Sequence, residues 1–144
     1  MAPTARELAH FAGAWRLDRR ITHADGSTAT FDGRACWQWQ GADLRLCEQG
    51  RLMLPGQPPV QAERCYLWAP GLRVHFADGR FFHEVPAQGG RATHWCPPDM
   101  YDGWYDFSDW PRFTVTWRVN GPRKSYEMIS RYAPEDAVPP SGSR

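Results

Sequence analysis

The sequence predicts an all-β protein: a single antiparallel up-and-down β-barrel of about ten strands, preceded by a short helix. Apolar and polar residues alternate with period two from the end of that helix onward, and Gly or Pro interrupts the alternation at short intervals. The expected hairpins follow one another without a break, which favours a closed, lipocalin-like (calycin-like) barrel over a β-sandwich. Barrels of this size enclose a ligand cavity.

Length and charge restrict the function. The 144 residues are expected to form one domain, with the barrel over residues 1–133 and a disordered Pro/Ser-rich tail over residues 134–144. The 17 basic and 16 acidic side chains nearly balance, which argues against a nucleic-acid partner. No segment is apolar enough for a signal peptide or a membrane span, so we expect no membrane partner and a cytoplasmic location. In that compartment Cys36, Cys47, Cys65 and Cys96 are expected to be thiols.

The leading helix is predicted over residues 5–11. Thr4 and Glu7 have the spacing of a capping box, and Leu8 and Phe11 supply the apolar side that packs on the barrel.

The Asp78-Gly79 pair predicts a tight two-residue hairpin. It places Val74 opposite His83 and Phe76 opposite Phe81, all on the inward face, with His75 and Phe82 facing outward. A loop over residues 87–90 would then place His83 opposite His94 and Phe81 opposite Cys96. The expected result is two inward imidazoles beside a thiol.

Three other turns predict further pairs. Gly41-Ala42 and the loop over residues 55–57 place Cys36 opposite Cys47 and Cys47 opposite Cys65, in an outward row. The same register brings Glu48 opposite Arg64 on the inward face, where the two charges should pair. The Asn120-Gly121 turn places Lys124 inward, opposite Trp117.

Several motifs together resemble a known family. Gly13-Ala14-Trp15 after a short helix resembles the opening of lipocalin-type barrels. The longer set resembles the uncharacterised bacterial domain-of-unknown-function family DUF6314: Glu48-x-Gly50-x-Leu52, Arg64-x-Tyr66-x-Trp68, Asp78-Gly79-Arg80, His94-x-Cys96-x-x-Asp99-x-Tyr101 and Gly121-Pro122-Arg123-Lys124. The resemblance implies a lipocalin-like fold and a cytoplasmic location, and it implies no activity.

An apolar cavity with a few polar groups is the usual form of a small-molecule site. The first hypothesis is a barrel whose ligand is apolar or aromatic with a polar or anionic end, held by Arg64 or Lys124. The ligand-binding residues expected are Glu48, Arg64, Tyr66, His83, His94, Cys96, Tyr105, Trp117, Lys124 and Tyr126.

Two alternatives stay open. One is a small enzyme of isomerase, dehydratase or cyclase type, with His83 and His94 as acid and base assisted by Tyr101. The other is a haem or metal-binding barrel that uses His83, His94 and Cys96. Two inward histidines that only make structural hydrogen bonds explain the pattern equally well, so no metal or cofactor is assigned. A homodimer is conceivable through Phe82 and Trp104, which are expected to be exposed.

Overall fold

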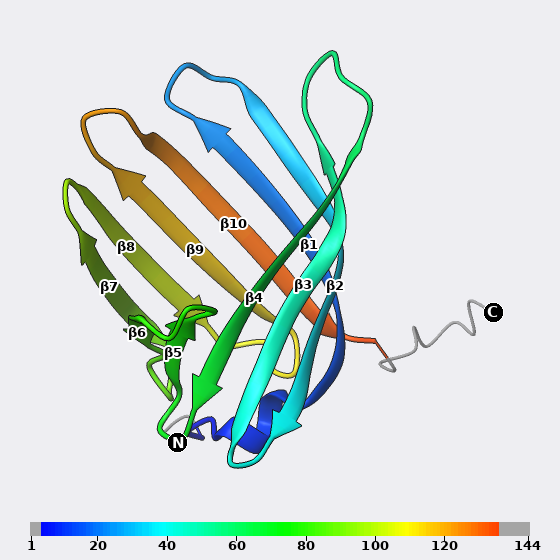
Figure 1. Cartoon of the computed structure of the whole chain (residues 1–144), viewed down its shortest axis with the longest axis vertical. Helices are drawn as coiled ribbons and strands as arrows, with labels where there is room; N and C mark the ends of the chain where they lie inside the picture. Colours follow the sequence, from blue (N-terminus) through cyan, green and yellow to red (C-terminus); the bar gives the residue numbers. More distant parts are fainter. Residues whose placement is uncertain (1–3, 136–144) are drawn as a thin grey trace.

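The computed structural model describes residues 4–135, in which ten antiparallel strands form one sheet (Figure 1). The sheet order is β6-β5-β4-β3-β2-β1-β10-β9-β8-β7. The strands are β1 (Gly13–His23), β2 (Thr28–Gln40), β3 (Asp43–Met53), β4 (Val60–Ala69), β5 (Arg73–Phe76), β6 (Phe81–Glu84), β7 (Gly90–Cys96), β8 (Asp99–Asp106), β9 (Phe113–Asn120) and β10 (Ser125–Pro134).

The sheet curls into a nearly closed barrel, which confirms the predicted fold class (Figure 1). Its two edges are β6 and β7, which are consecutive in the chain and adjacent in space but form no ladder within residues 4–135. The predicted pairs of His83 with His94 and of Phe81 with Cys96 are therefore wrong. The sequence shows that the two strands are consecutive, but where the barrel leaves its seam depends on the curvature of all ten strands.

An aromatic cluster closes one end of the barrel. The leading helix is a 3-10 helix over Leu8–Phe11, shorter than predicted, and its capping box joins Glu7 to His10 instead of starting at Thr4. Phe11 is fully buried, and its ring lies 5.0 Å from that of Trp68 and 5.8 Å from that of Trp37. The Nε1–H of Trp15 donates a 2.8 Å hydrogen bond to the Phe11 carbonyl, which fixes the helix under the barrel.

The predicted registers of the central strands are confirmed. Cys36 pairs with Cys47 across β2 and β3, and Cys47 pairs with Cys65 across β3 and β4. Glu48 lies opposite Arg64, as expected. However, Cys47 and Cys65 form a disulfide, so the expectation that these two are thiols is wrong, while Cys36 and Cys96 are free.

The predicted register of the Asp78-Gly79 hairpin is confirmed at Val74 and His83 but is wrong near the loop. Val74 lies opposite His83, but a β-bulge after Val74 places His75, not Phe76, opposite Phe81. The Phe76 N–H donates to the Arg80 carbonyl and the Gly79 N–H donates to the Phe76 carbonyl, so the loop has an additional residue. The extra residue exchanges the faces of two aromatics: Phe81 is 44% exposed, and Phe82 turns inward.

The β9–β10 hairpin differs in a similar way. Its loop is longer than the predicted Asn120-Gly121 turn: Ser125 pairs with Asn120 and Met128 pairs with Trp117. Because the shift is even, Tyr126 keeps its inward face. Lys124 falls in the loop, where it is exposed and pairs with Asp99 at 3.4 Å, so its predicted inward position is wrong.

At the end of the described chain, β10 runs to Pro134, and Glu135 forms an ion pair with Arg34. Residues 136–144 of the predicted tail lie outside the described residues. None of the helices in the described part is long and apolar enough to cross a membrane.

Candidate functional site

The barrel contains a cavity of about 380 Å³. Its walls come from almost every strand. The lining residues His23, Leu54 and Tyr126 lie at or beside the ends of β1, β3 and β10, next to the β1–β2, β3–β4 and β9–β10 hairpins, so the cavity extends to that end of the barrel. Figure 1 shows these three hairpins at the same end of the sheet. The aromatic cluster around Phe11 closes the opposite end. This volume is within the range of small-molecule sites, about 300–1,000 Å³.

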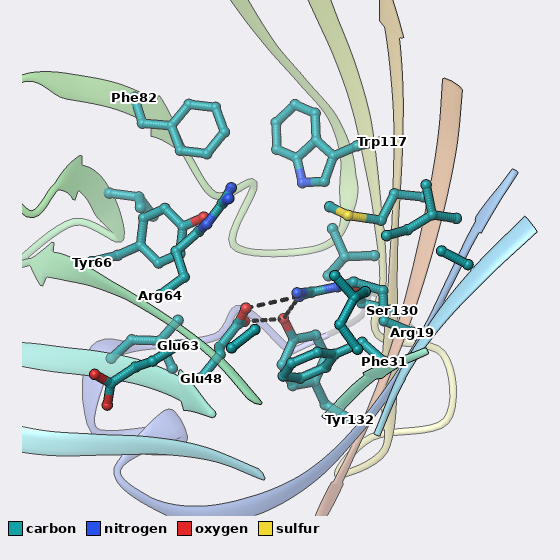
Figure 2. Close-up of a pocket in the computed structure, with 18 of the residues that line it drawn as sticks. Arg19, Phe31, Glu48, Glu63, Arg64, Tyr66, Phe82, Trp117, Ser130 and Tyr132 are labelled. Carbon is teal, nitrogen blue, oxygen red and sulfur yellow. Dashed lines mark hydrogen bonds and ion pairs between the residues drawn. The ribbon is translucent and has the colours of Figure 1, made fainter. Parts of the chain in front are cut away.

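A buried polar network lies on one wall (Figure 2). Arg19 Nη2 forms a 2.9 Å ion pair with Glu48 Oε1, and the Tyr132 hydroxyl donates a 2.6 Å hydrogen bond to Glu48 Oε2. Arg19 Nε also donates to the Ser130 hydroxyl at 2.7 Å. Glu48 is only 4% exposed, so the network stabilises a carboxylate that would otherwise be costly to bury.

The network corrects one prediction. Glu48 faces the cavity as expected, but its ion-pair partner is Arg19 and not Arg64. Burial acts to lower the pKa of the Arg19 guanidinium. Glu48 and the neighbouring tyrosines act in the opposite direction and outweigh burial, so the pKa is raised overall. Burial, followed by Glu48, raises the pKa of Tyr132 well above its usual value, which keeps its hydroxyl a donor.

His83 lies on another part of the wall, where its Nε2 and the Tyr105 hydroxyl are 2.8 Å apart. Burial, and to a lesser degree the nearby His94, lowers the pKa of His83 to about 3. Burial likewise raises the pKa of Tyr105. Both side chains are therefore neutral at physiological pH, and the pair offers hydrogen bonds but no charge. His83 Nδ1 is buried and has no hydrogen-bond partner within residues 4–135.

The second positive charge of the cavity belongs to Arg64. Figure 2 shows its guanidinium beside Tyr66, on the side of the cavity away from the Glu48 network. Arg64 forms no ion pair with any residue in the described part of the chain, and its side chain is exposed. Burial and Glu48 raise the pKa of Tyr66, and the charge of Arg64 opposes this rise.

Two parallel rings complete this side of the cavity. The rings of Phe82 and Trp117 are stacked, with centroids 5.3 Å apart. Trp117 packs against Gly103, its partner on β8: a Cβ built at Gly103 would come within 2.7 Å of the indole. The absence of a side chain at Gly103 thus sets the position of the Trp117 ring in the cavity.

The structure brings together most of the predicted ligand-binding and catalytic residues, and leaves others outside the cavity. Those that line the cavity are Glu48, Arg64, Tyr66, His83, Tyr105, Trp117 and Tyr126. Those that do not are His94, Cys96, Tyr101 and Lys124. Arg19 and Ser130 line it but were absent from the prediction, although the period-two pattern of Trp15, Leu17 and Arg19 already places Arg19 on the inward face.

His94 is half-buried at the seam, behind Phe82. Its ring lies 5.1 Å from that of Phe82 and 5.7 Å from that of Tyr101. Burial lowers the pKa of His94, and a hydrogen bond with the Phe82 backbone opposes the shift. The predicted triad of His83, His94 and Cys96 does not converge: within residues 4–135, the potential metal ligands that gather within 4.8 Å are Cys47, Glu63 and Cys65.

Fold and cavity together define a lipocalin-like β-barrel with an internal pocket. The chain belongs to the family of unknown function DUF6314, which its residues 11–134 match. Among solved structures it is similar to the S-type phycobiliprotein lyase CPES from Guillardia theta. The TM-score is 0.67 over 91% of this chain and 92% of that chain, at 7% sequence identity, and this likeness shows the fold alone. No curated protein matches the chain.

Proposed function

We propose that the protein binds a small molecule in the barrel cavity, and that this ligand has an apolar or aromatic body and an anionic end. The observation that carries the proposal is Arg64, a cation at the cavity wall with no ion-pair partner in the described chain. The stacked rings of Phe82 and Trp117 line the same cavity. Arg19, the other cation of the cavity, is already neutralised by Glu48.

The chemistry of the wall defines the ligand's two parts. Planar rings stack favourably on Phe82 and Trp117. A carboxylate, sulfonate or phosphate would accept hydrogen bonds from the Arg64 guanidinium in a bidentate geometry, and from the Tyr66 hydroxyl beside it. The phycobiliprotein lyase shares the fold and does not specify this chain's ligand.

The enzyme alternative gains less support. A general base works best with a pKa near the operating pH, whereas the pKa of His83 is lowered to about 3. His94 and Tyr101 lie outside the cavity lining. Catalytic roles for His83, His94 and Tyr101 remain predictions, and turnover of a bound ligand that is lost in His83→Gln would support them.

The expected partners and location are also proposals. A homodimer would use the outer face of β7 and β8, where Trp95 and Trp104 are exposed, and no longer Phe82. Sedimentation at increasing protein concentration tests it. The cytoplasmic location remains a prediction that cell fractionation would check.

Two fluorescent probes of the same shape test the binding proposal. Anilinonaphthalene sulfonate is aromatic and anionic, and N-phenylnaphthylamine has nearly the same rings without the charge. We expect the protein to bind one sulfonate per chain more tightly than the amine. Arg64→Ala should lower the affinity for the sulfonate by at least about tenfold, or 1.4 kcal/mol. The affinity for the amine should stay nearly unchanged.

The matched control is Arg45→Ala, which removes an exposed arginine from β3. It should leave both affinities unchanged. Equal losses for both probes in Arg64→Ala, or equal effects of Arg64→Ala and Arg45→Ala on the sulfonate, would contradict the proposal.

A further inference from the structure

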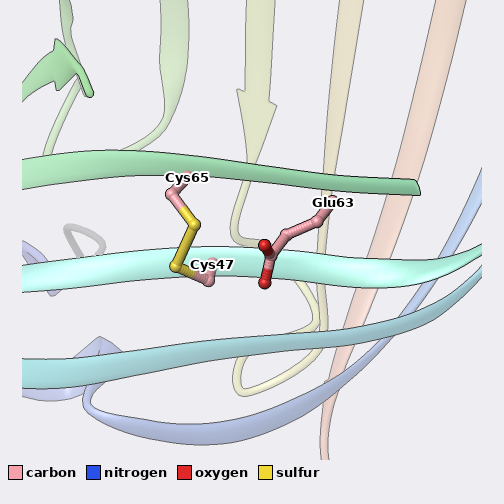
Figure 3. A group of neighbouring side chains, drawn as sticks. All are labelled: Cys47, Glu63 and Cys65. Carbon is pink, nitrogen blue, oxygen red and sulfur yellow. A yellow bond between two sulfur atoms is a disulfide. The ribbon is translucent and has the colours of Figure 1, made fainter. Parts of the chain in front are cut away.

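β3 and β4 carry a group of sulfur and oxygen ligands, of which Glu63 also borders the cavity while Cys47 and Cys65 do not line it. Cys47 and Cys65 lie opposite each other on the two strands, with Cα atoms 4.1 Å apart, and both are half-buried (Figure 3). The carboxylate of Glu63 lies beside them, and the ligand atoms of the three residues are within 4.8 Å of one another.

In the disulfide form the exposed carboxylate of Glu63 makes few polar contacts. Its carboxylate accepts a 3.0 Å hydrogen bond from Gln49 Nε2, its cross-strand partner, and forms no ion pair within residues 4–135. A disulfide gains nothing from an adjacent carboxylate. Two thiolates beside that carboxylate would repel it and each other unless a cation lay between them.

We propose that the reduced form of this group, Cys47, Cys65 and Glu63, binds a divalent cation of zinc type. Zinc takes thiolate and carboxylate ligands, at about 2.3 Å and 2.0–2.2 Å, and two sulfurs on a tetrahedral zinc are about 3.8 Å apart. Opposed cysteines on neighbouring strands reach that separation by side-chain rotation. Gln49 holds the carboxylate in place, and water completes the tetrahedron.

A dithiol can reduce the Cys47–Cys65 disulfide by thiol–disulfide exchange. The Cys47–Cys65 bond accepts two electrons and two protons and yields two thiols, while the dithiol becomes a disulfide. Zinc then displaces both thiol protons to solvent. The consequence is that β3 and β4 stay joined at this point in either state, by the disulfide when oxidised and by the cation when reduced. These strands also carry Glu48 and Arg64, next in sequence to Cys47 and Cys65.

The test uses a Cys36→Ser/Cys96→Ser background, which leaves Cys47 and Cys65 as the remaining cysteines. The protein is reduced with dithiothreitol, desalted without oxygen and titrated with Co²⁺. We expect one Co²⁺ per chain, a thiolate-to-cobalt charge-transfer band and displacement by Zn²⁺. The oxidised protein should show no such band.

Glu63→Gln should weaken Co²⁺ binding at least about tenfold, while Glu84→Gln, which alters an exposed carboxylate on β6, should not. The absence of the charge-transfer band in the reduced protein, or equal effects of Glu63→Gln and Glu84→Gln, would overturn the proposal. If reduction unfolds the barrel, Zn²⁺ should restore its circular dichroism, and failure to do so would overturn the proposal too. None of these readouts depends on ligand binding in the cavity.

Discussion

Glu48 on β3 pairs with Arg19 on β1 across the intervening strand β2, at 2.9 Å, although its neighbour in the ladder is Arg64. Both members of the pair are largely buried, at 13% and 4% exposure. The pairing neutralises one arginine of the cavity and leaves the other available, which is the basis of the proposed ligand chemistry.

Removal of either member of this pair should be costly. We expect Glu48→Ala or Arg19→Met to lower the free energy of unfolding by about 3–5 kcal/mol, because each leaves a buried charge without its partner. The Arg19→Met/Glu48→Met double variant should recover much of this loss. Urea unfolding measures all three.

Arg64→Met is the matched variant and should change the free energy of unfolding by less than about 1 kcal/mol. Comparable losses in Arg19→Met and Arg64→Met would show that the ion pair is assigned to the wrong arginine.

The inward position of Phe82 can be tested against its exposed neighbour. Phe82 stacks on Phe76 at 4.6 Å and on Trp117 at 5.3 Å, whereas Phe81 faces solvent. Phe82→Ala should therefore lower the free energy of unfolding by about 2 kcal/mol or more. Phe81→Ala should change it by no more than about 1 kcal/mol. The reverse order would mean that the hairpin has no bulge.

Gly103→Ala should displace the Trp117 ring, because the new methyl group would overlap the indole. Overpacking of this kind costs about 1–3 kcal/mol. We expect a changed near-ultraviolet circular dichroism spectrum and weaker binding of the sulfonate probe. In Gly103→Ala/Trp117→Leu the cost should be smaller than the sum of the two single costs. Native spectrum and native affinity in Gly103→Ala would contradict the packing described.

His83 should make stability depend on pH. Its pKa is about 3 in the folded protein and 6.5 in an exposed histidine, so the unfolded chain binds the extra proton first as the pH falls. The contribution of the neutral imidazole is complete above pH 6.5 and is lost progressively toward pH 3. The slope approaches about 1.4 kcal/mol per pH unit in this window.

The measurement is the difference in free energy of unfolding between the wild type and His83→Gln across that pH range. The difference should shrink as the pH falls. A constant difference for His83→Gln would refute the lowered pKa of His83.

Patterns among residues close in sequence predicted the strand order and most of the strand registers. Two-residue periodicity and turn residues correctly placed Cys47 opposite Cys65 and Glu48 opposite Arg64, because a hairpin register depends on a few adjacent residues. The errors arose where a loop was longer than its turn signal suggested, as at Lys124. They also arose at the bulge in the Asp78-Gly79 hairpin, because the extra residue changes the faces between the bulge and the loop, where Phe81 and Phe82 lie, while Val74 stays opposite His83.

The remaining errors concern contacts that depend on the three-dimensional curvature of the sheet. The ion pair of Arg19 with Glu48 spans β2, and the seam that separates His83 from His94 follows from the curvature of the whole sheet. Neither can be obtained from pairing rules for consecutive strands. The disulfide was missed for a different reason: the register was right, but the expected compartment excluded the bond.

A crystal structure of the protein with bound anilinonaphthalene sulfonate would show where the barrel holds an aromatic anion. We expect the probe inside the barrel, with its rings against Phe82 and Trp117 and its sulfonate within hydrogen-bond distance of the Arg64 guanidinium. A probe bound instead to the outer face beside Trp95 and Trp104, with nothing in the cavity, would contradict it.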